Sequence, residues 1–418
     1  MKTLILKNKI FKNISYIFII QILIQFFPII LIPLIINKVG MDGFGIYQFT
    51  ISVSSFLFII VDYGHSLSAP KKIVSIRKDT KHLSEYFSRI LFSRLFLTII
   101  CIFFMVFILS IVDAYKIYRI PTYIISLYFI GNILFPLWFF QGMESLLIPS
   151  ILNLVSRSII FVLVVFFINS KDDLNSLLWV FSLVTLFQGI LSIVICIKKY
   201  NLTIFKPSIK EIIITLNDDK YLFLSQALTS LLSATNPLIL GLFTNPVIVG
   251  AFALAEKIVR TSMIILSSIN RVIYPISIQK FSESLDEGIK FIKKILKLGI
   301  PLFAFISISL FFGGELIINI FTHENIDYIN KIIKILSILP LTIFLNNIFG
   351  NQISLSLGFE KKFSLVIFAT VSLNIILILL LVPKYLGLGM AYSLLISELF
   401  ICVSMFILSI YAIKKEVY

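Results

Sequence analysis

Four charged side chains, those of Glu256, Lys257, Arg260 and Arg271, lie within the otherwise largely apolar stretch 247–275. If this stretch is one helix, Arg260 neighbours both Glu256 and Lys257, because residues three and four apart lie on the same face. Arg271 follows Arg260 by about three helical turns and shares its side. Guanidinium and ammonium groups bind phosphate through charge-assisted hydrogen bonds. The stretch therefore predicts a cationic stripe that attracts an anionic ligand.

Two further arginines lie within apolar runs. Arg157 follows about nine residues of its run, roughly 14 Å at the rise of a helix, and Arg94 lies about one turn into another run. Arg94 and Arg271 have an alternative interpretation, snorkelling to a membrane surface. We predict that Lys257, Arg260, Arg157, Arg271 and Arg94 form the substrate-binding site.

Three acidic residues, Asp62, Glu256 and Glu398, are candidates for binding a coupling proton or cation. Acidic side chains within apolar runs are rare and often functional. Asp62 has a structural alternative, an ion pair with Arg94, and Glu256 could instead neutralise Lys257. Glu398 lies near the middle of its run and has no such neighbour in the sequence.

The composition indicates the elements that position these residues. The chain has 418 residues, of which 59% are hydrophobic and 14% charged, and its mean hydropathy is +1.03. Soluble proteins have roughly 45–50% apolar and about 25% charged residues. The chain is therefore expected to be an all-α polytopic membrane protein. A charge near the middle of a membrane helix costs about 2.5–3.5 kcal/mol, so such residues normally face protein or a water-filled cavity.

Other function classes find little support. The net charge of +15 could indicate nucleic-acid binding, but the basic residues lie between apolar runs, as in membrane proteins with positively charged cytoplasmic loops. The three cysteines lie inside apolar runs, and the three histidines lack metal-ligand spacing. No Walker A pattern is present in the sequence. We expect no catalytic residue, no metal and no cofactor.

About twelve spans of ~20 residues fit the chain. They are predicted at Ile14–Ile36, Phe44–Gly64, Ile90–Val112, Thr122–Gly142, Ile148–Ile168, Leu177–Ile197, Tyr221–Phe243, Val247–Pro275, Ile295–Ile318, Ile335–Leu357, Phe363–Val382 and Leu388–Ala412. Most Lys and Arg residues fall in the connections on the side of the termini, which predicts cytoplasmic termini. The basic connections 66–88 and 199–220 are expected either to lie along anionic membrane lipids or to be solvated connectors.

The two halves of the chain show a weak repeat. Four pairs of residues share one offset: Tyr16 and Tyr221, Gln21 and Gln226, Gly45 and Gly250, Tyr47 and Phe252. We therefore expect an N-terminal six-helix lobe at 1–200, a cytoplasmic linker at 201–220 and a C-terminal six-helix lobe at 221–418. An even number of spans per half gives parallel repeats, related by a pseudo-two-fold axis along the membrane normal.

Several short motifs carry a resemblance to a known family. They include Asp62-Tyr63-Gly64, the stretch 136–144 (PLWFFQGME) followed by Arg157, Ala255-Glu256-Lys257, and Gly387-Leu388-Gly389 with Ser397-Glu398. In this order the chain resembles the Wzx-type O-antigen flippases of the multidrug/oligosaccharidyl-lipid/polysaccharide exporter superfamily. One departure is that the connection 170–175 (SKDDLN) lacks the glycines found before the last span.

This resemblance implies a substrate and partners. The substrate would be an undecaprenyl-diphosphate-linked oligosaccharide, moved by alternating access from the cytoplasmic to the periplasmic leaflet of a bacterial inner membrane. A polysaccharide polymerase and a chain-length regulator would be possible partners. Because nothing covalent is required, the chain would not be an enzyme.

Two alternatives remain open. A drug/cation antiporter of the same superfamily would favour acidic and aromatic residues in its cavity, against the excess of Arg and Lys in this chain. A membrane glycosyltransferase or polysaccharide polymerase would need a large external loop, and none is predicted.

Overall fold

The computed structural model describes residues 2–112, 115–234 and 236–417. Within these ranges the side chains of 2–19, 21, 22, 25, 225, 228, 229, 231–234, 264, 265, 267, 268, 271, 272, 416 and 417 lie outside the described part. Among the residues singled out above, this applies to the side chains of Tyr16, Gln21 and Arg271.

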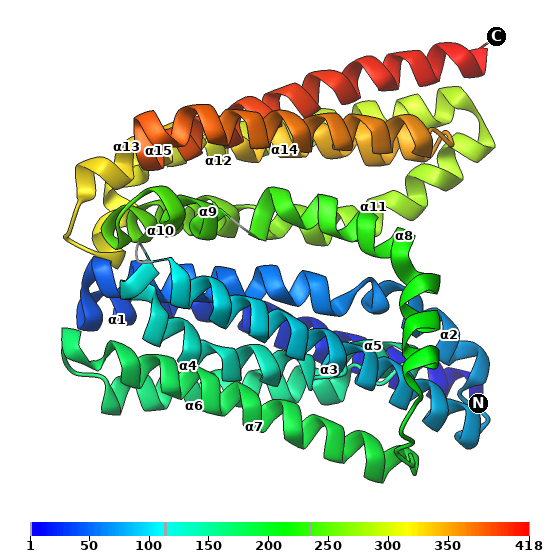
Figure 1. Ribbon diagram of the computed structural model, residues 1–418. Helices are drawn as coiled ribbons and strands as arrows, with labels where there is room; N and C mark the ends of the chain where they lie inside the picture. Colours follow the sequence, from blue (N-terminus) through cyan, green and yellow to red (C-terminus); the bar gives the residue numbers. More distant parts are fainter. Residues whose placement is uncertain (1, 113–114, 235, 418) are drawn as a thin grey trace. The chain divides into compact units, whose positions relative to one another are not determined.

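The described chain is helical and contains no strand (Figure 1). It divides into two compact units, Met1–Leu238 and Ile239–Tyr418. The first unit contains α1 Lys2–Asp62, α2 His65–Ile76, α3 Thr80–Ile111, α4 Lys116–Ile133, α5 Leu137–Gly142, α6 Leu147–Phe167, the short η2 Lys171–Asp173, α7 Leu174–Tyr200 and α8 Ile209–Ala234. The short α9 Asn236–Phe243 crosses the boundary. The second unit contains α10 Pro246–Ser262, α11 Ile264–Glu283, α12 Leu285–Phe321, α13 Ile326–Leu336, α14 Leu339–Asn347, the π-helical η3 Ile348–Leu355 and α15 Glu360–Val417.

Eight helices in the described chain are long and apolar enough to cross a membrane. Two long helices contain breaks where the sequence predicted connections between spans. In α1 the break is at Gly40, whose φ of 77° favours glycine. In α15 it is at Leu386, with φ 55° and ψ −128°. Together with α8–α9 and α10–α11, the helical segments follow the predicted order of spans.

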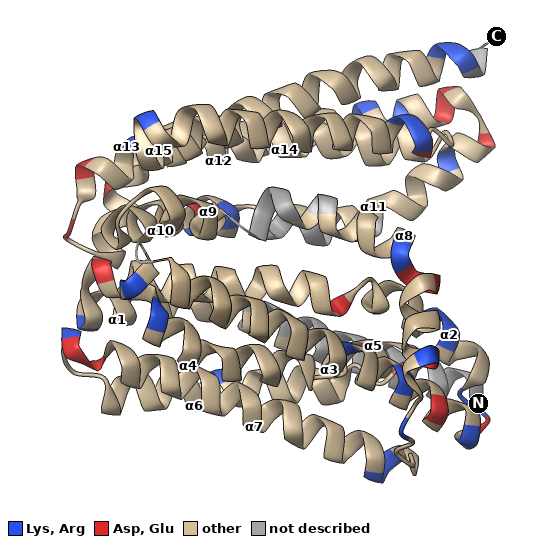
Figure 2. Cartoon of the chain, viewed as in Figure 1, with Lys and Arg blue, Asp and Glu red and all other residues tan. Residues whose placement is uncertain are grey.

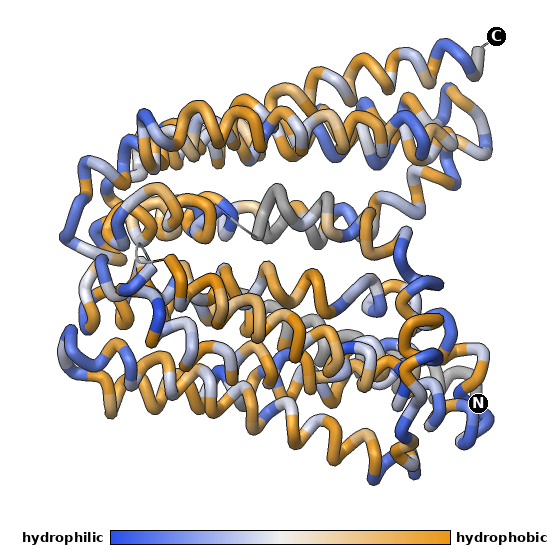
Figure 3. The backbone as a smooth tube through the Cα atoms, viewed as in Figure 1, coloured by the Kyte–Doolittle hydropathy of each residue, from blue (hydrophilic) through white to orange (hydrophobic). Residues whose placement is uncertain are grey.

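Hydropathy and charge divide along the helices. Apolar residues occupy their middle parts (Figure 3), and most charged residues lie near their ends (Figure 2). Large apolar side chains such as Phe103 on α3 and Phe312 and Leu316 on α12 point outward and are exposed. In water such surfaces would be unusual for a monomer, whereas the hydrocarbon of a bilayer solvates them.

In the first unit, α4 and α7 pack with their backbones almost in contact. A Cβ on Gly189 would lie 2.3 Å from the carbonyl oxygen of Gly131, and a Cβ on Gly131 would lie 2.5 Å from the backbone of Thr185. Only glycine permits this distance, so the two glycines fix the pairing of these helices. Ser182 on α7 donates a hydrogen bond to the carbonyl oxygen of Ile124 and reinforces the pair.

The two basic connections contain more helix than the sequence predicted. In the first, α2 buries His65, Ala69 and Ile73, which are spaced one turn apart, and leaves Lys71 and Lys72 exposed. Its buried face packs on a cluster that includes Trp138, Phe139 and Phe140 of α5. In the second, α8 begins at Ile209, inside the predicted linker, and packs with the first unit.

In the second unit, aromatic stacking fixes α12 against α14. The rings of Phe303 and Phe344 stack with centroids 4.7 Å apart. Gly299 lies under Phe344, and a Cβ there would lie 2.1 Å from the edge of that ring. This packing holds α14 and its π-helical continuation η3 beside α12.

Candidate functional site

The last turn of α1 brings Asp62 against α3. Its Oδ1 lies 3.7 Å from Nη2 of Arg94, and each side chain is only 2% exposed. The Arg94 guanidinium also lies over the ring of Phe58, 5.4 Å from its centroid. The other Asp62 oxygen accepts a hydrogen bond from the backbone N–H of Ser66. The ion pair with Arg94, one of the two interpretations of Asp62, is therefore present.

The turn after Asp62 is tight because two residues adopt left-handed backbone conformations. Tyr63 has φ 47° and Gly64 has φ 83°. A Cβ on Gly64 would lie 2.9 Å from Cβ of Leu222 and 3.0 Å from the backbone nitrogen of Phe223. The turn between α1 and α2 therefore rests directly on α8.

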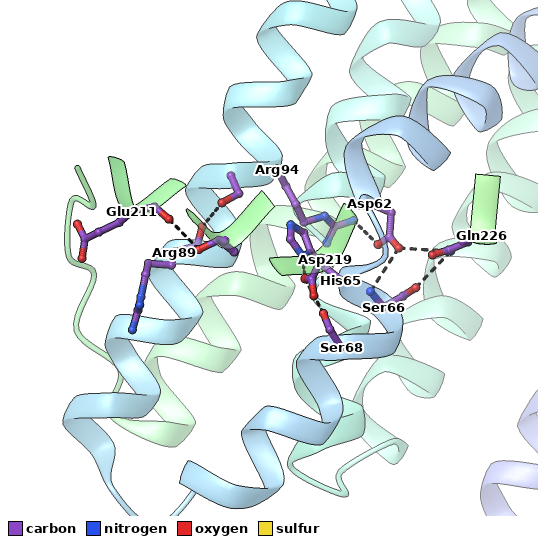
Figure 4. A network of polar contacts seen from close by, with 11 residues as sticks. Asp62, His65, Ser66, Ser68, Arg89, Arg94, Glu211, Asp219 and Gln226 are labelled. Atoms are coloured by element: carbon purple, nitrogen blue, oxygen red, sulfur yellow. Dashed lines mark hydrogen bonds and ion pairs between the residues drawn. The ribbon is translucent and has the colours of Figure 1, made fainter. Parts of the chain in front are cut away.

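One face of α8 contacts this turn, and Figure 4 shows Asp219 and Gln226 at the two ends of that face. Asp219, Leu222, Phe223 and Gln226 follow the spacing of a single helical face. The Phe223 ring stacks on that of Tyr63 with centroids 4.4 Å apart and planes 2° apart. We call these four residues the α8 stripe.

The two ends of the α8 stripe are polar. Oδ2 of Asp219 lies 2.8 Å from Nδ1 of His65 and accepts a hydrogen bond from the Ser68 hydroxyl at 2.7 Å. At the other end, the amide of Gln226 donates to Asp62 at 3.4 Å and to the Ser66 hydroxyl at 3.3 Å. The α8 stripe is thus fastened to the turn by stacking in its middle and by polar contacts at both ends.

A pocket of about 360 Å³ opens beside Gln226 in the first unit. It is lined by Ser54, Ser55, Phe58, Ile59, Tyr128, Asn132, Gln226 and Ser230. Six of these eight side chains carry a hydroxyl or amide group, and two, Phe58 and Tyr128, carry aromatic rings. Such a lining offers hydrogen bonds and flat apolar faces to a polyhydroxylated ligand.

Arg157 is half-buried on α6 in the same unit. Arg157 lies near enough to Tyr47 of α1 to influence it electrostatically, and Tyr47 and Tyr128 of the pocket pack against one apolar cluster. The Tyr47 ring packs against Phe181 of α7 at 4.9 Å. Arg157 and the polar pocket therefore belong to the same part of the first unit.

The second unit contains a separate charged cluster. Nε of Arg260 donates to Oε1 of Glu256 at 2.9 Å, and the Arg260 side chain remains 40% exposed. Glu398 on α15 interacts with the Arg260 charge and with the side chain of Asn346 on α14. Its second carboxylate oxygen is buried and has no hydrogen-bond partner in the described structure. The structure thus brings together Glu256, Arg260 and Glu398, three of the residues that the sequence singled out.

The prediction of a single helix across 247–275 is wrong. Helix α10 ends at Ser262, and α11 begins at Ile264 after a break at Met263. The shared side of Arg260 and Arg271, which was predicted from a single helix, stays a prediction. The side chain of Arg271 lies outside the described residues, and Lys257 is exposed on α10.

Several residues of these clusters were not predicted. His65 was considered only as one of three histidines without metal-ligand spacing, and Asp219, Tyr128, Asn132 and Asn346 were not singled out. One signal was available: the spacing of Asp219, Leu222, Phe223 and Gln226 indicates a helical face with polar ends. Nothing in one sequence pairs that face with the residues after Asp62.

Comparisons with known proteins identify the family. The family model described as "Polysaccharide biosynthesis protein" matches residues 10–281. The chain belongs to this family. Two of its relatives, both named "Putative O-antigen transporter", cover nearly the whole chain. The protein from Escherichia coli (strain K12) is 26% identical over 387 residues, 93% of each chain. The protein from Shigella dysenteriae is 25% identical over 397 residues, 94% of this chain and 98% of its own.

Solved structures show the fold that this family member adopts. An inward-facing MATE-family multidrug resistance transporter of the MOP superfamily matches with a TM-score of 0.71 at 12% identity, over 94% of this chain and 95% of its own. The lipid II flippase MurJ in an inward closed conformation matches with a TM-score of 0.72 at 13% identity, over 94% of this chain and 87% of its own. The chain therefore has the all-helical fold of these membrane transporters.

Proposed function

We propose that this chain is a flippase for undecaprenyl-diphosphate-linked oligosaccharides of an O-antigen or related surface polysaccharide. The observation that carries the proposal is the pocket lined by hydroxyl and amide groups among membrane-spanning helices, in a family member whose relatives are named as O-antigen transporters. The direction would be from the cytoplasmic to the periplasmic leaflet of a bacterial inner membrane, with both termini in the cytoplasm.

The chemistry of such a substrate explains the two kinds of polar site. Sugars and a diphosphate cannot cross hydrocarbon unaided, because losing their hydrogen bonds to water costs several kcal/mol per group (about 4–8 for one amide or hydroxyl). The hydroxyl and amide groups around Tyr128 and Asn132 would replace water around the sugars. Arg157 in the first unit or Arg260 in the second would bind the diphosphate, and the lipid chain would remain in the bilayer.

Transport by this route needs no covalent step and no cofactor. The proposed mechanism is alternating access. Among the predicted coupling residues, Asp62 and Glu256 have arginine partners in the structure. Glu398, with one buried oxygen that lacks a hydrogen-bond partner, remains a proposed site for a coupling ion.

Deletion of the gene, followed by complementation, tests this function. Loss of the flippase should cause lipid-linked repeat units to accumulate in the cytoplasmic leaflet and should remove the surface polysaccharide. Re-expression of the wild-type chain should restore both. If surface polysaccharide is unchanged and sensitivity to cationic drugs rises instead, the chain is an antiporter and the proposal is wrong.

A further inference from the structure

His65, the first residue of α2, is a fully buried titratable group. Its side chain is 0% exposed, and its Nδ1 lies 2.8 Å from Oδ2 of Asp219, whose side chain is 12% exposed. The other ring nitrogen, Nε2, is buried and has no hydrogen-bond partner in the described structure. Because Nδ1 already faces a carboxylate, it holds a proton in either charge state, and Nε2 is the atom at which a second proton binds.

Several charged and titratable groups surround His65, so a proton on its imidazole changes the local balance of charge. From the end of α1 and the turn after it, His65 is approached by Asp62 and by Tyr63, whose ring centroid lies 6.3 Å from the imidazole. On α3, Arg94 pairs with Asp62, and Tyr86 lies near Asp219 and Arg89. On α8, Asp219 is buried and Asp218 is exposed, and α5 contributes no titratable group.

The net formal charge of the four buried groups Asp62, Arg94, Asp219 and His65 depends on whether His65 is protonated. Asp62 and Arg94 neutralise each other, so a neutral His65 leaves the negative charge of Asp219 unbalanced. A protonated His65 balances that charge. Its contact with the Asp219 carboxylate, a hydrogen bond when the imidazole is neutral, then becomes an ion pair, which is the stronger interaction.

We propose that the His65–Asp219 pair binds a coupling proton, and that protonation of His65 tightens the attachment of α8 to the turn between α1 and α2. Nε2 is shielded from solvent in the observed arrangement, so a proton reaches it only when the surrounding helices open locally. Because protonation strengthens the contact between His65 and Asp219, protonation and the attachment of α8 are linked, as coupling requires.

The place of α8 in the chain connects this switch to transport. Helix α8 is the last long helix before the boundary at Leu238 between the two units. Its attachment depends on the α8 stripe, and the polar ends of that stripe contact His65 and the pair formed by Asp62 and Arg94. The link to transport rests on the proposed flippase function, whereas the protonation of the pair does not.

Hydrogen–deuterium exchange of the full-length protein in lipid nanodiscs tests whether protonation of His65 tightens the attachment of α8. In the wild type, exchange in 209–226, corrected for its intrinsic pH dependence, should be slower at pH 5.5 than at pH 8 by on the order of tenfold. His65→Gln should abolish this pH dependence, and Asp219→Asn should do the same. A His65→Gln protein that keeps the wild-type dependence would overturn the proposal.

The chain provides a matched control. His82 lies 2.7 Å from Asp79 through the same ring nitrogen, but these side chains are 66% and 54% exposed. His82→Gln should therefore leave the pH dependence of exchange in α8 unchanged. If the His65 variants do not fold, the imidazole of His65 can be titrated by NMR in the wild-type protein. A resonance that does not change between pH 5 and pH 8 would equally overturn the proposal.

A transport assay in proteoliposomes tests separately whether protonation of the His65–Asp219 pair is coupled to transport. A pH gradient should alter the wild-type flipping rate, and His65→Gln should respond at least tenfold less to it, whereas His82→Gln should respond as the wild type does. If exchange in α8 depends on His65 but the flipping rate does not, the pair binds a proton without coupling it to transport. If the wild type flips no lipid-linked oligosaccharide at all, the proposed function fails while the exchange result stands.

Discussion

The carboxylate of Asp62 lies 3.7 Å from the guanidinium of Arg94, and both side chains are 2% exposed. Removing one partner of a buried ion pair leaves an uncompensated charge and costs about 3–5 kcal/mol. We expect Arg94→Met to lower the melting temperature of the purified protein strongly. The double variant Asp62→Asn/Arg94→Met should recover much of this loss, because no buried charge remains unpaired. Thermal unfolding in detergent, followed by tryptophan fluorescence, measures the effect.

An exposed ion pair serves as the control for this prediction. Arg77 lies 2.9 Å from Glu144, closer than Arg94 lies to Asp62, but the side chains are 34% and 67% exposed. Arg77→Met should cost at most about 1 kcal/mol, because exposed pairs contribute little. Equal losses for the two arginine variants would show that burial does not determine the strength of the Asp62–Arg94 pair.

A second prediction concerns Gly64, which combines a positive φ with a close approach to α8. Gly64→Ala forces alanine into the left-handed region, at a cost of about 1–3 kcal/mol, and brings Cβ to 2.9 Å from Leu222. Gly358 has a similar φ of 79°, but a Cβ on Gly358 would meet nothing within 4 Å. Gly64→Ala should therefore lower the melting temperature clearly more than Gly358→Ala, and similar losses in both variants would contradict the close packing of α8.

The order of the helices could be predicted from the sequence because hydrophobic length is a local property. The breaks at Gly40 and Leu386 fall where the composition interrupts the apolar runs. The ion pair between Asp62 and Arg94 could also be predicted as one alternative, because two opposite charges at the same depth of a membrane protein are expected to pair.

The remaining contacts depend on tertiary packing. The sequence places Asp219 after a run of polar residues, and only the packing of α8 on the turn after Asp62 buries it beside His65. In the same way, no proline or glycine lies next to Met263 in the sequence, so the break there was not predicted and a single helix was expected across 247–275. The pocket residues Tyr128 and Asn132 of α4 come to line the same pocket as Gln226 of α8 only when the first unit folds.

A third prediction uses the contact between α4 and α7. Gly131→Ala would place Cβ 2.5 Å from the backbone of Thr185, which cannot move without separating the two helices. We expect a loss of several kcal/mol, above the ~1–3 kcal/mol typical of overpacking, and little folded protein. Gly313→Ala on α12 is the control, because a Cβ there meets nothing within 4 Å and alanine favours the helix. The yield of monodisperse protein in size-exclusion chromatography distinguishes the two.

A fourth prediction tests the polar pocket. Tyr128→Phe removes one hydroxyl group from the pocket lining and should slow flipping of the lipid-linked oligosaccharide about fivefold, the effect of one hydrogen bond worth ~1 kcal/mol. Tyr123→Phe on the same helix removes a hydroxyl that contacts Ser110 outside the pocket and should leave the rate unchanged. Both variants should keep the wild-type melting temperature. An unchanged rate in Tyr128→Phe would remove its hydroxyl from the substrate site.

The last prediction concerns Arg260, whose guanidinium is held by Glu256 at 2.9 Å while its side chain stays 40% exposed. If Arg260 binds the diphosphate, Arg260→Ala should abolish flipping although the protein still inserts in the membrane. Arg260→Lys keeps the charge but loses the planar fork that binds phosphate oxygens in pairs, so it should retain partial activity. Lys294→Ala, which removes an exposed charge from α12, controls for a general effect of net charge. Flipping rates in proteoliposomes, normalised to inserted protein, give the comparison. Full activity of the Arg260→Ala variant would remove this residue from the substrate site, and inactivity of the Arg260→Lys variant would show that the fork geometry, and not the charge alone, is required.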